Sequence, residues 1–538
     1  MIKINRPVLP AFMLLLAIPA LTAAQAVLPG GYKTSALTDK TLKAAAAFGR
    51  GAYGDFPSVL PVPPEPPGAH KPPPDPQFIE QASVYTGYVA TLYYMMRAKI
   101  EDSGILPGTQ AVPSFGDVSK KVIAAVKNSG FTPRGPGHGS LLADAGFLAE
   151  MENLSGARFL DGNTSDFLID GESSFAVKDS LIKNAKKSIY IASYSFHDDV
   201  TGFEAADMLI EAKKRGVEVK VILDSKVIYT AGARVVKRMR DAGVEVLRHM
   251  DPKRKGDYWH MKMLLVDDKY AIVGGMNYSD HYSHKNPDGP MWRDTDVLYT
   301  GPAAAETRRI FSGIWNSAVE KGGLPLTAIA QGPGAGAPAG SARVAVIFQD
   351  PPVSSPPILL NIVKAIYGAT RQINIENPYY VAVPAITQAI LEARARGVEV
   401  NILTNSKKSI DAEAKPMADI IIKGLLPLVP AGVNVYLKKG QTLHSKFMTV
   451  DGVYCNIGSY NFHPRSERYD TELNVAIMDS ASVARLNAAF LKDLAEAEAI
   501  RTVADLGYEP GWLSKIVGKY FYAELSPAKP LVRLGEEL

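Results

Sequence analysis

Two histidine–lysine pairs are the residues of this chain best suited to chemistry. His260 and Lys262 form one pair, and His444 and Lys446 form the other. Both pairs lie in strand-like apolar runs, where side chains two residues apart share a face. An imidazole has a pKa of about 6.5, so one ring can be neutral and nucleophilic while another is protonated and acidic. Two lysines attract an anion, for which phosphate is the obvious candidate. If the pairs meet, they support displacement at phosphorus through a phosphohistidine.

Each pair is followed by the same kinds of polar residue at the same distances. Asp267 and Asp451 lie five residues after the lysines. Each is an odd number of residues from its histidine, which predicts that it points to the opposite face or caps a turn and is therefore structural. Further along, small residues allow close backbone approach to a ligand, and asparagines can donate to an anionic oxygen. These residues are Gly275 and Asn277 in the first copy, and Ser459 and Asn461 in the second.

Each imidazole also needs a partner that orients its second ring nitrogen. Asp296 and Glu472 are the candidates, because segments 293–297 and 469–473 read Arg-Asp-Thr-Asp-Val and Tyr-Asp-Thr-Glu-Leu. The alternative for each is a solvated surface acid. The pairs form no metal-ligand cluster, and no cofactor is expected.

An internal repeat organises the chain around these residues. Residues 205–223 have a counterpart 181 residues on, at 386–404, and each copy reads as an amphipathic helix, a glycine stop and an apolar strand. Strands that alternate with helices predict an α/β sheet covered on both faces. Two such copies in tandem predict two similar αβα sandwich domains related by a pseudo-twofold axis.

The N-terminal region differs in composition from the repeats. Residues 1–26 have a basic start, an apolar run and small residues at the end, which predicts a secretory signal and an exported, periplasmic or secreted protein. The alternative is an uncleaved anchor. Ten prolines in 57–76 indicate an extended strap, and the tyrosine-rich stretch 78–99 indicates a helix that either lies on lipid headgroups or packs on the body. The expected segments are a signal at 1–26, an N-terminal extension at 27–154, domains at 155–330 and 343–505 with a Gly/Ala/Pro linker at 331–342, and a tail at 506–538.

Composition narrows the function classes further. The formal net charge of +4 over 538 residues excludes a histone-like polycation and makes nucleic acid the less favoured partner. Cys455 is the only cysteine, which excludes an internal disulfide and a cysteine-based zinc site.

The doubled motifs resemble the phospholipase D superfamily, which is named for its duplicated His-x-Lys-x4-Asp motif. In the second copy, segments 377–380, 403–406 and 458–466 are similar to the bacterial cardiolipin synthase branch. The resemblance implies two phospholipase D-like domains and a metal-independent phosphohistidine route. It also implies that His260 is the nucleophile and His444 the acid and base.

The resemblance further implies a phospholipid substrate at a membrane surface, with peripheral membrane contact. Transfer to an alcohol and hydrolysis by water share every step up to the phosphohistidine, and the sequence does not choose between them. Two alternatives from other classes are an exported nuclease of the same superfamily and an inactive scaffold.

Overall fold

The computed structural model describes residues 115–225, 231–249, 257–330, 332, 336–350, 355–412, 414–511 and 515. All described elements belong to one unit of the chain, Gln77–Leu538. The expected signal, the proline-rich strap and the helix at 78–99 lie outside the described residues. Of the helices that are described, none is both long and apolar enough to cross a bilayer.

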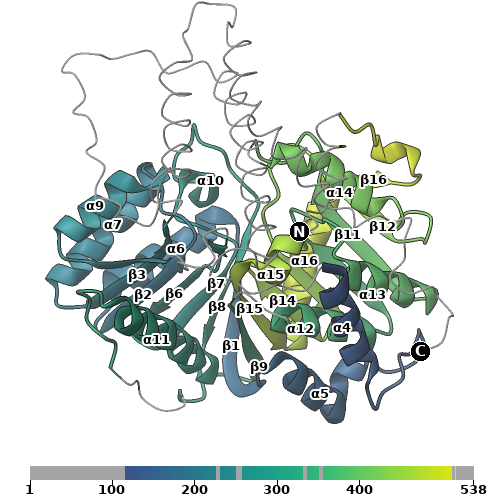
Figure 1. Cartoon of the computed structure of the whole chain (residues 1–538), viewed down its shortest axis with the longest axis horizontal. Coiled ribbons are helices and arrows are strands. Elements are labelled where there is room, and N and C mark those ends of the chain that lie inside the picture. Colours follow the sequence, from purple (N-terminus) through teal and green to yellow (C-terminus); the bar gives the residue numbers. More distant parts are fainter. Residues whose placement is uncertain are drawn as a thin grey trace, which may run out of the picture. The chain divides into compact units, whose positions relative to one another are not determined.

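Helices and strands alternate through most of the described chain (Figure 1). The α-helices are α4 (Phe115–Lys127), α5 (Ala145–Ser155), α6 (Asp170–Asn184), α7 (Val200–Lys214), α9 (Ala233–Asp241), α10 (Asp280–Ser283), α11 (Pro302–Gly322), α12 (Pro357–Gly368), α13 (Pro384–Ala395), α14 (Ala418–Leu425), α15 (Pro464–Arg468) and α16 (Ser480–Ala495). The strands are β1 (Leu160–Ile169), β2 (Ser188–Ser193), β3 (Glu218–Asp224), β4 (Glu245–His249), β5 (Tyr258–Trp259), β6 (Met263–Val266), β7 (Tyr270–Gly274), β8 (Thr295–Thr300), β9 (Ala342–Gln349), β10 (Gln372–Glu376), β11 (Glu399–Asn405), β12 (Asn434–Lys438), β13 (Phe447–Val450), β14 (Tyr454–Gly458), β15 (Asp470–Met478) and β16 (Ala497–Ile500).

The strands form one sheet whose two halves have matching orders. From the centre outward, one half runs β1-β8-β7-β6-β2-β3-β4 and the other runs β9-β15-β14-β13-β10-β11-β12-β16, while β5 pairs with β15. The halves join where β1 pairs antiparallel with β9, so that Leu160 lies opposite Val344. Matching orders on either side of an antiparallel central pair are what a twofold axis between β1 and β9 produces. The expected α/β architecture with two equivalent repeats is confirmed, and the sheet continues from one repeat into the other.

Both faces of this sheet are covered by helices, because its central strands are apolar on both sides. In β2, Ile189 and Ile191 pack beneath α6, α7 and α9, whereas Tyr190 and Ala192 face the core that contains α11 and α16. Residues of both repeats contribute to the core that contains α11 and α16. That face therefore holds the two repeats together.

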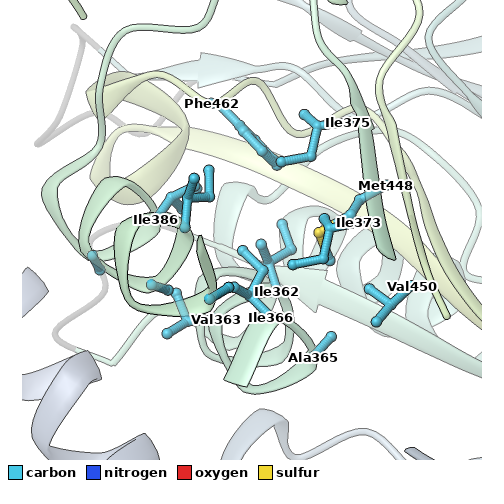
Figure 2. Packing of buried hydrophobic residues seen from close by; sticks show 14 of the residues in the cluster. Ile362, Val363, Ala365, Ile366, Ile373, Ile375, Ile386, Met448, Val450 and Phe462 are labelled. Carbon is cyan, nitrogen blue, oxygen red and sulfur yellow. The ribbon is translucent and has the colours of Figure 1, made fainter. Parts of the chain in front are cut away.

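Helix α12 of the second repeat is buried on nearly every side. Figure 2 shows its inner face, where apolar residues of α12, β10 and β13 meet: Ile362, Ile366, Ile373, Ile375 and Met448. Helices α4 and α5, which precede the first repeat, cover its outer face (Figure 1). The fully buried ring of Phe147 in α5 packs so closely that a Cβ at Gly368 would lie 2.7 Å from it. The segment before the repeats is thus anchored on the second repeat.

Candidate active site

The backbone of each repeat docks the histidine of the other repeat. Strand β5 pairs in parallel with the start of β15, and the His260 N–H donates to the carbonyl of Thr471 at 3.0 Å. In the same way, the His444 N–H donates to the carbonyl of Arg293 at 2.7 Å. Because both contacts cross the twofold axis, the two histidines converge on the sheet centre. The two pairs share one site, because Asn277 hydrogen-bonds to Ser195 N and to the hydroxyl of Tyr282, and the rings of Tyr194 and Tyr282 lie 5.4 Å from His260 and 5.0 Å from His444.

Each imidazole is held by a carboxylate from the opposite repeat. His260 Nδ1 lies 3.0 Å from both oxygens of Glu472, and His444 Nδ1 lies 2.7 Å from Asp294 Oδ2. A carboxylate at Nδ1 fixes the tautomer with the proton on that nitrogen, which leaves Nε2 with a lone pair. The structure therefore places Glu472 on a histidine ring, as the sequence predicts, and shows that the ring belongs to the other repeat.

The prediction that Asp296 orients a histidine is wrong, because Asp294 occupies that place. Asp296 instead accepts from Lys178 Nζ at 2.8 Å and from Ser174 Oγ at 2.6 Å. The error is a slip of two residues in the alignment of the repeats. In the sheet, Gly274 pairs with Asp296 and Gly458 pairs with Asn474, so the counterpart of Asp296 is Asn474.

Arg293 anchors the segment that carries Asp294. Its Nε donates to both oxygens of Asp493 on α16, at 2.9 and 3.0 Å, and its Nη1 donates to the carbonyl of Asp294 at 2.7 Å. Asp170, which follows β1, adds two backbone contacts to the same residue: its N–H donates to the carbonyl of Asp294 at 2.9 Å, and its Oδ1 accepts from the N–H of Asp294 at 3.3 Å. Asp294 is therefore fixed from both repeats.

The two small residues predicted beside the site lie directly against the acids. A Cβ at Gly275 would lie 2.2 Å from Asp294 Oδ1, so any side chain there displaces the carboxylate. Ser459 is fully buried, accepts from the Leu473 N–H at 3.0 Å, and makes a hydrogen bond that lowers the pKa of Glu472. Close packing under each acid explains why both positions are small.

The lysines lie beside their own histidines, as the strand alternation predicts. Each Nζ donates to the carbonyl oxygen of the histidine two residues earlier, and Lys446 Nζ also lies 3.0 Å from His444 Nδ1. Burial lowers the pKa of Lys262 to about 7, although Glu472 opposes the shift. Burial also lowers the pKa of Lys446 to about 8, with Asp294 opposing. Both ammonium groups therefore gain strongly from a nearby anion.

Burial moves the pKa values of the histidines and acids in the directions that favour neutral forms. Desolvation, helped by the adjacent lysine charges, holds the pKa of His260 and His444 well below the ordinary value. With these neighbours both imidazoles therefore favour the neutral form, including the ring of His444, to which the resemblance assigns the acid role. Burial raises the pKa of Glu472 to about 7 and raises that of Asp294.

The two asparagines lie next to the site, and their side chains differ in their hydrogen bonds. Asn277 accepts from Ser195 N at 3.3 Å and donates to the hydroxyl of Tyr282 at 3.1 Å, which leaves one amide hydrogen for a ligand. The backbone N–H of Asn461 donates to Ser466 Oγ at 3.3 Å, and that hydroxyl donates to Glu472 at 2.7 Å. The buried Asn461 Oδ1 makes no hydrogen bond to any described residue.

The motif aspartates point away from the site and hold turns, as their odd spacing from the histidines predicts. Asp267 has a φ of +55° and accepts from three successive backbone N–H groups, at residues 186–188. Asp451 has a φ of +53° and accepts from the equivalent groups at residues 370–372. Each carboxylate thus ties the start of a neighbouring central strand.

Aromatic rings that sequence reasoning did not single out surround the histidines. The ring centroids of Tyr282, Trp292 and Tyr379 lie 5.0, 5.4 and 6.2 Å from that of His444. The centroid of Tyr194 lies 5.4 Å from that of His260. Among these residues only Tyr379 has a sequence signal, because it belongs to the segment 377–380.

Comparison with known proteins agrees with this geometry. A family model described as cardiolipin synthase, PLD-like domain, matches residues 179–315 and 362–494. The major cardiolipin synthase ClsA of Bacillus subtilis (strain 168) is 30% identical over 346 residues, which cover 63% of this chain and 70% of that protein. Cardiolipin synthase A of Pseudomonas fluorescens (strain SBW25) is 30% identical over 363 residues, which cover 66% and 73%. The crystal structure of phosphatidylserine synthase from Haemophilus influenzae Rd KW20 has the same fold, with a TM-score of 0.58 at 17% identity over 72% of this chain and 99% of that chain. The chain belongs to the phospholipase D superfamily of enzymes, within its cardiolipin synthase branch.

Proposed function

We propose that this protein transfers a phosphatidyl group between glycerophospholipids, as a cardiolipin synthase does, through a covalent phosphohistidine. One observation carries the proposal: two neutral imidazoles from opposite repeats, each with a carboxylate on Nδ1, share a buried site with two lysines. This arrangement offers two Nε2 atoms to one phosphorus. The membership in the cardiolipin synthase branch supports phosphatidylglycerol as the donor.

In the first step, the lone pair of His260 Nε2 attacks the phosphorus of the donor lipid. The N–P bond forms, the P–O bond to the headgroup alcohol breaks, and the leaving oxygen takes a proton from His444 Nε2. His444 needs that proton beforehand, and the negative phosphodiester next to it raises its pKa when the lipid binds. The choice of His260 as nucleophile follows the family resemblance.

In the second step, a hydroxyl group replaces the departed alcohol. It gives its proton to His444 Nε2 and attacks the phosphorus, and the N–P bond breaks to regenerate neutral His260. A second phosphatidylglycerol as acceptor produces cardiolipin and releases glycerol overall, whereas water produces phosphatidic acid. The second route is the hydrolase alternative.

The lysines stabilise the charge on the non-bridging oxygens. Because Lys262 and Lys446 have pKa values of about 7 and about 8, they are poised between charged and neutral forms until an anion binds. A phosphodiester restores both charges inside a buried site, where hydrogen bonds to ionised groups are strong.

The decisive experiment incubates the purified protein with vesicles of headgroup-labelled phosphatidylglycerol in EDTA. We expect labelled glycerol and cardiolipin, with phosphatidic acid as the product of water attack. A parallel incubation with plasmid tests the nuclease alternative, which requires nicking in the same buffer. No turnover of either substrate would support the inactive scaffold.

Histidine variants then test the covalent step. We expect His260→Asn to abolish labelled covalent enzyme when the label is in the phosphatidyl group, and His444→Asn to form it slowly and fail to resolve it. Each variant should lose at least about 10³-fold in turnover. His138→Asn is the matched control, because His138 is exposed and its Nδ1 lies 3.2 Å from the carbonyl of Gly135. Near-native turnover in both site variants would refute the assignment.

A further inference from the structure

Three polar side chains on the His444 side of the site take no part in the steps above. They are Tyr379, which follows β10, Asp411, which follows β11, and His281 in α10 of the other repeat. Strands β10 and β11 are parallel neighbours, so the loops after them meet at the same edge of the sheet. We refer to Tyr379, Asp411 and His281 as the His444-side cluster.

The cluster is connected to the ring of His444 directly by Tyr379 and through Trp292 by His281. The hydroxyl of Tyr379 donates to Asp411 Oδ2 at 2.6 Å, and the ring of Tyr379 lies 6.2 Å from that of His444. The ring of His281 lies 4.8 Å from that of Trp292, which in turn lies 5.4 Å from that of His444. The cluster therefore borders His444 from both repeats.

The burial of Asp411 is unusual for a carboxylate whose only role is to hold a loop. Asp411 is 9% exposed, and burial raises the pKa of its carboxyl group, although the hydrogen bonds from Tyr379 and the Ala414 N–H and the charge of His281 lower it. Ala414 N donates to Oδ1 at 2.9 Å and the N–H of Asp411 itself also contributes, so three donors meet the four acceptor positions of the carboxylate and one lone pair remains. Burying a carboxylate is costly, and such a group is retained where further donors can reach it.

The proposed reaction determines which substrate lies next to the His444-side cluster. The leaving alcohol departs beside the histidine that protonates it, and the acceptor alcohol must arrive at the same place, because the second step reverses the first. If His444 is the acid and base, the residues around His444 contact the alcohol, while those around His260 contact the phosphatidyl side.

We propose that Tyr379, Asp411 and His281 form a subsite for the hydroxyl groups of a glycerol-type acceptor. The carboxylate of Asp411 accepts from one hydroxyl, and the Tyr379 oxygen or a His281 ring nitrogen accepts from or donates to a neighbouring one. In a vicinal diol one hydroxyl goes to His444 and the neighbouring one can bind this cluster, and glycerol has a second hydroxyl for it, whereas an alcohol with a single hydroxyl must give that hydroxyl to His444. This inference rests on the proposed transfer reaction and explains how an alcohol competes with water.

The test measures how the covalent enzyme partitions between acceptors. Full-length protein is incubated with phosphatidylglycerol vesicles and increasing labelled glycerol or labelled ethanol, and the ratio of labelled phospholipid to phosphatidic acid is measured. For Asp411→Asn and Tyr379→Phe we expect the slope of this ratio against glycerol to fall about tenfold, the loss expected for one hydrogen bond to a charged group. The slope against ethanol should stay within about twofold, because ethanol uses only His444.

The controls separate failure of the subsite from failure of the proposed function. Asp207→Asn, an exposed acid on α7 that pairs with Arg238 at 2.6 Å, should behave as wild type. Tyr379→Phe removes only a hydroxyl and guards against misfolding of the Asp411 variant. Equal slopes for glycerol in all variants, or parallel losses for glycerol and ethanol, would overturn the subsite while total lipid turnover continues. Absence of any lipid product from wild type would instead overturn the proposed function.

Discussion

The two repeats present the same reactive groups but support them with different interiors. Behind the first pair, Lys178 and Asp296 form a buried ion pair at 2.8 Å. At the equivalent place in the second repeat, Asn474 donates to Asn456 at 2.6 Å, and Asn456 donates to Asn361 at 3.0 Å. A charged pair and a neutral amide chain thus fill the same position. The twofold arrangement constrains the groups that face the phosphorus more strongly than it constrains the layer behind them.

The outer helices differ in the same way. The outer side of α6 is exposed at Glu172 and Ser173, whereas α12 is apolar on almost all sides because α4 and α5 cover it. A helix that is hydrophobic all round must be buried. The segment that carries α4 and α5 has therefore become part of the second repeat's core, and no described helix covers α6 of the first repeat in the same way.

The largest effect should come from the acids at Nδ1, where the two repeats agree. We expect Glu472→Gln and Asp294→Asn each to lower kcat by about 10²- to 10⁴-fold, because an amide no longer fixes the imidazole tautomer. Glu472→Gln should mainly slow formation of the covalent enzyme, whereas Asp294→Asn should slow both its formation and its resolution, because His444 is the acid in the first step and the base in the second. Rapid-quench measurement of labelled enzyme separates the two steps. Identical effects of both variants on formation and on resolution would show that the repeats do not divide the work between two histidines.

The wrong assignment of Asp296, in place of Asp294, as the partner of a histidine shows where prediction from the sequence fails. The histidines and lysines could be predicted because they recur at fixed distances in each repeat, and Glu472 because it lies in an Asp-Thr-acid triplet that resembles the one in the first repeat. The loop between the asparagine and the acid is not repeated: Asp294 lies 17 residues after Asn277, but Glu472 lies 11 after Asn461. Local similarity of the two Asp-Thr-acid triplets then favoured the wrong register.

Contacts between the two repeats could not be predicted from the sequence either. The pairing of β5 with β15 decides that Glu472 serves His260, and no spacing within one copy encodes that pairing. The His444-side cluster has the same origin, since Asp411 and His281 come from different repeats and have no periodic pattern. The general α/β order, by contrast, follows from apolar runs and glycine stops, which are local properties.

The buried ion pair offers a way to convert one interior into the other. Asp296→Asn leaves the Lys178 ammonium without its carboxylate, and we expect a loss of about 3–5 kcal/mol in the free energy of unfolding. Lys178→Asn combined with Asp296→Asn gives these two positions the amides that Asn361 and Asn474 provide in the second repeat, without the linking Asn456, and should recover most of that loss because no charge stays unpaired. Urea unfolding of the two singles and the double gives the coupling energy. Additive losses would mean that the two residues do not act as a pair.

The contribution of α5 to the stability of the second repeat can be tested at Phe147, whose ring is buried against α12. We expect Phe147→Ala to lower the free energy of unfolding by about 3 kcal/mol, because the substitution leaves a cavity against Gly368. Glu172→Ala on the exposed side of α6 is the control and should change it by less than about 0.5 kcal/mol. Thermal and urea unfolding monitored by circular dichroism give both values. A negligible effect of Phe147→Ala would show that α5 does not stabilise the second repeat.

Substitution of either motif aspartate should lower the stability of the protein, and the two losses should differ only in size. Asp451 is 2% exposed and accepts from the Thr370 hydroxyl at 3.1 Å in addition to the backbone groups, whereas Asp267 is half-buried. We expect Asp451→Asn to cost about 2 kcal/mol and Asp267→Asn about 1 kcal/mol of stability. Asparagine tolerates the positive φ, so the lost acceptor is the main change. Turnover at a temperature where both variants are folded should stay within about threefold of wild type, and a larger drop would contradict their structural role.

The pH dependence should distinguish the two lysines by a small but measurable margin. A lysine whose pKa is lowered keeps its charge only below that pKa, so kcat/KM should fall as pH rises, first as Lys262 deprotonates at about 7 and then as Lys446 does at about 8. On the acid side the rate should fall first as Glu472 is protonated, at about 7, and only at lower pH as His260 and His444 are protonated, because burial and the lysines depress the pKa values of the two histidines. In Lys262→Met the remaining alkaline limb should lie near that of Lys446, at about 8, and in Lys446→Met near that of Lys262, at about 7. Profiles of kcat/KM between about pH 6 and 9 resolve a separation of this size, since one pKa unit changes the charged fraction up to tenfold. An alkaline limb that does not move in either variant would assign it to another group and remove this difference between the repeats.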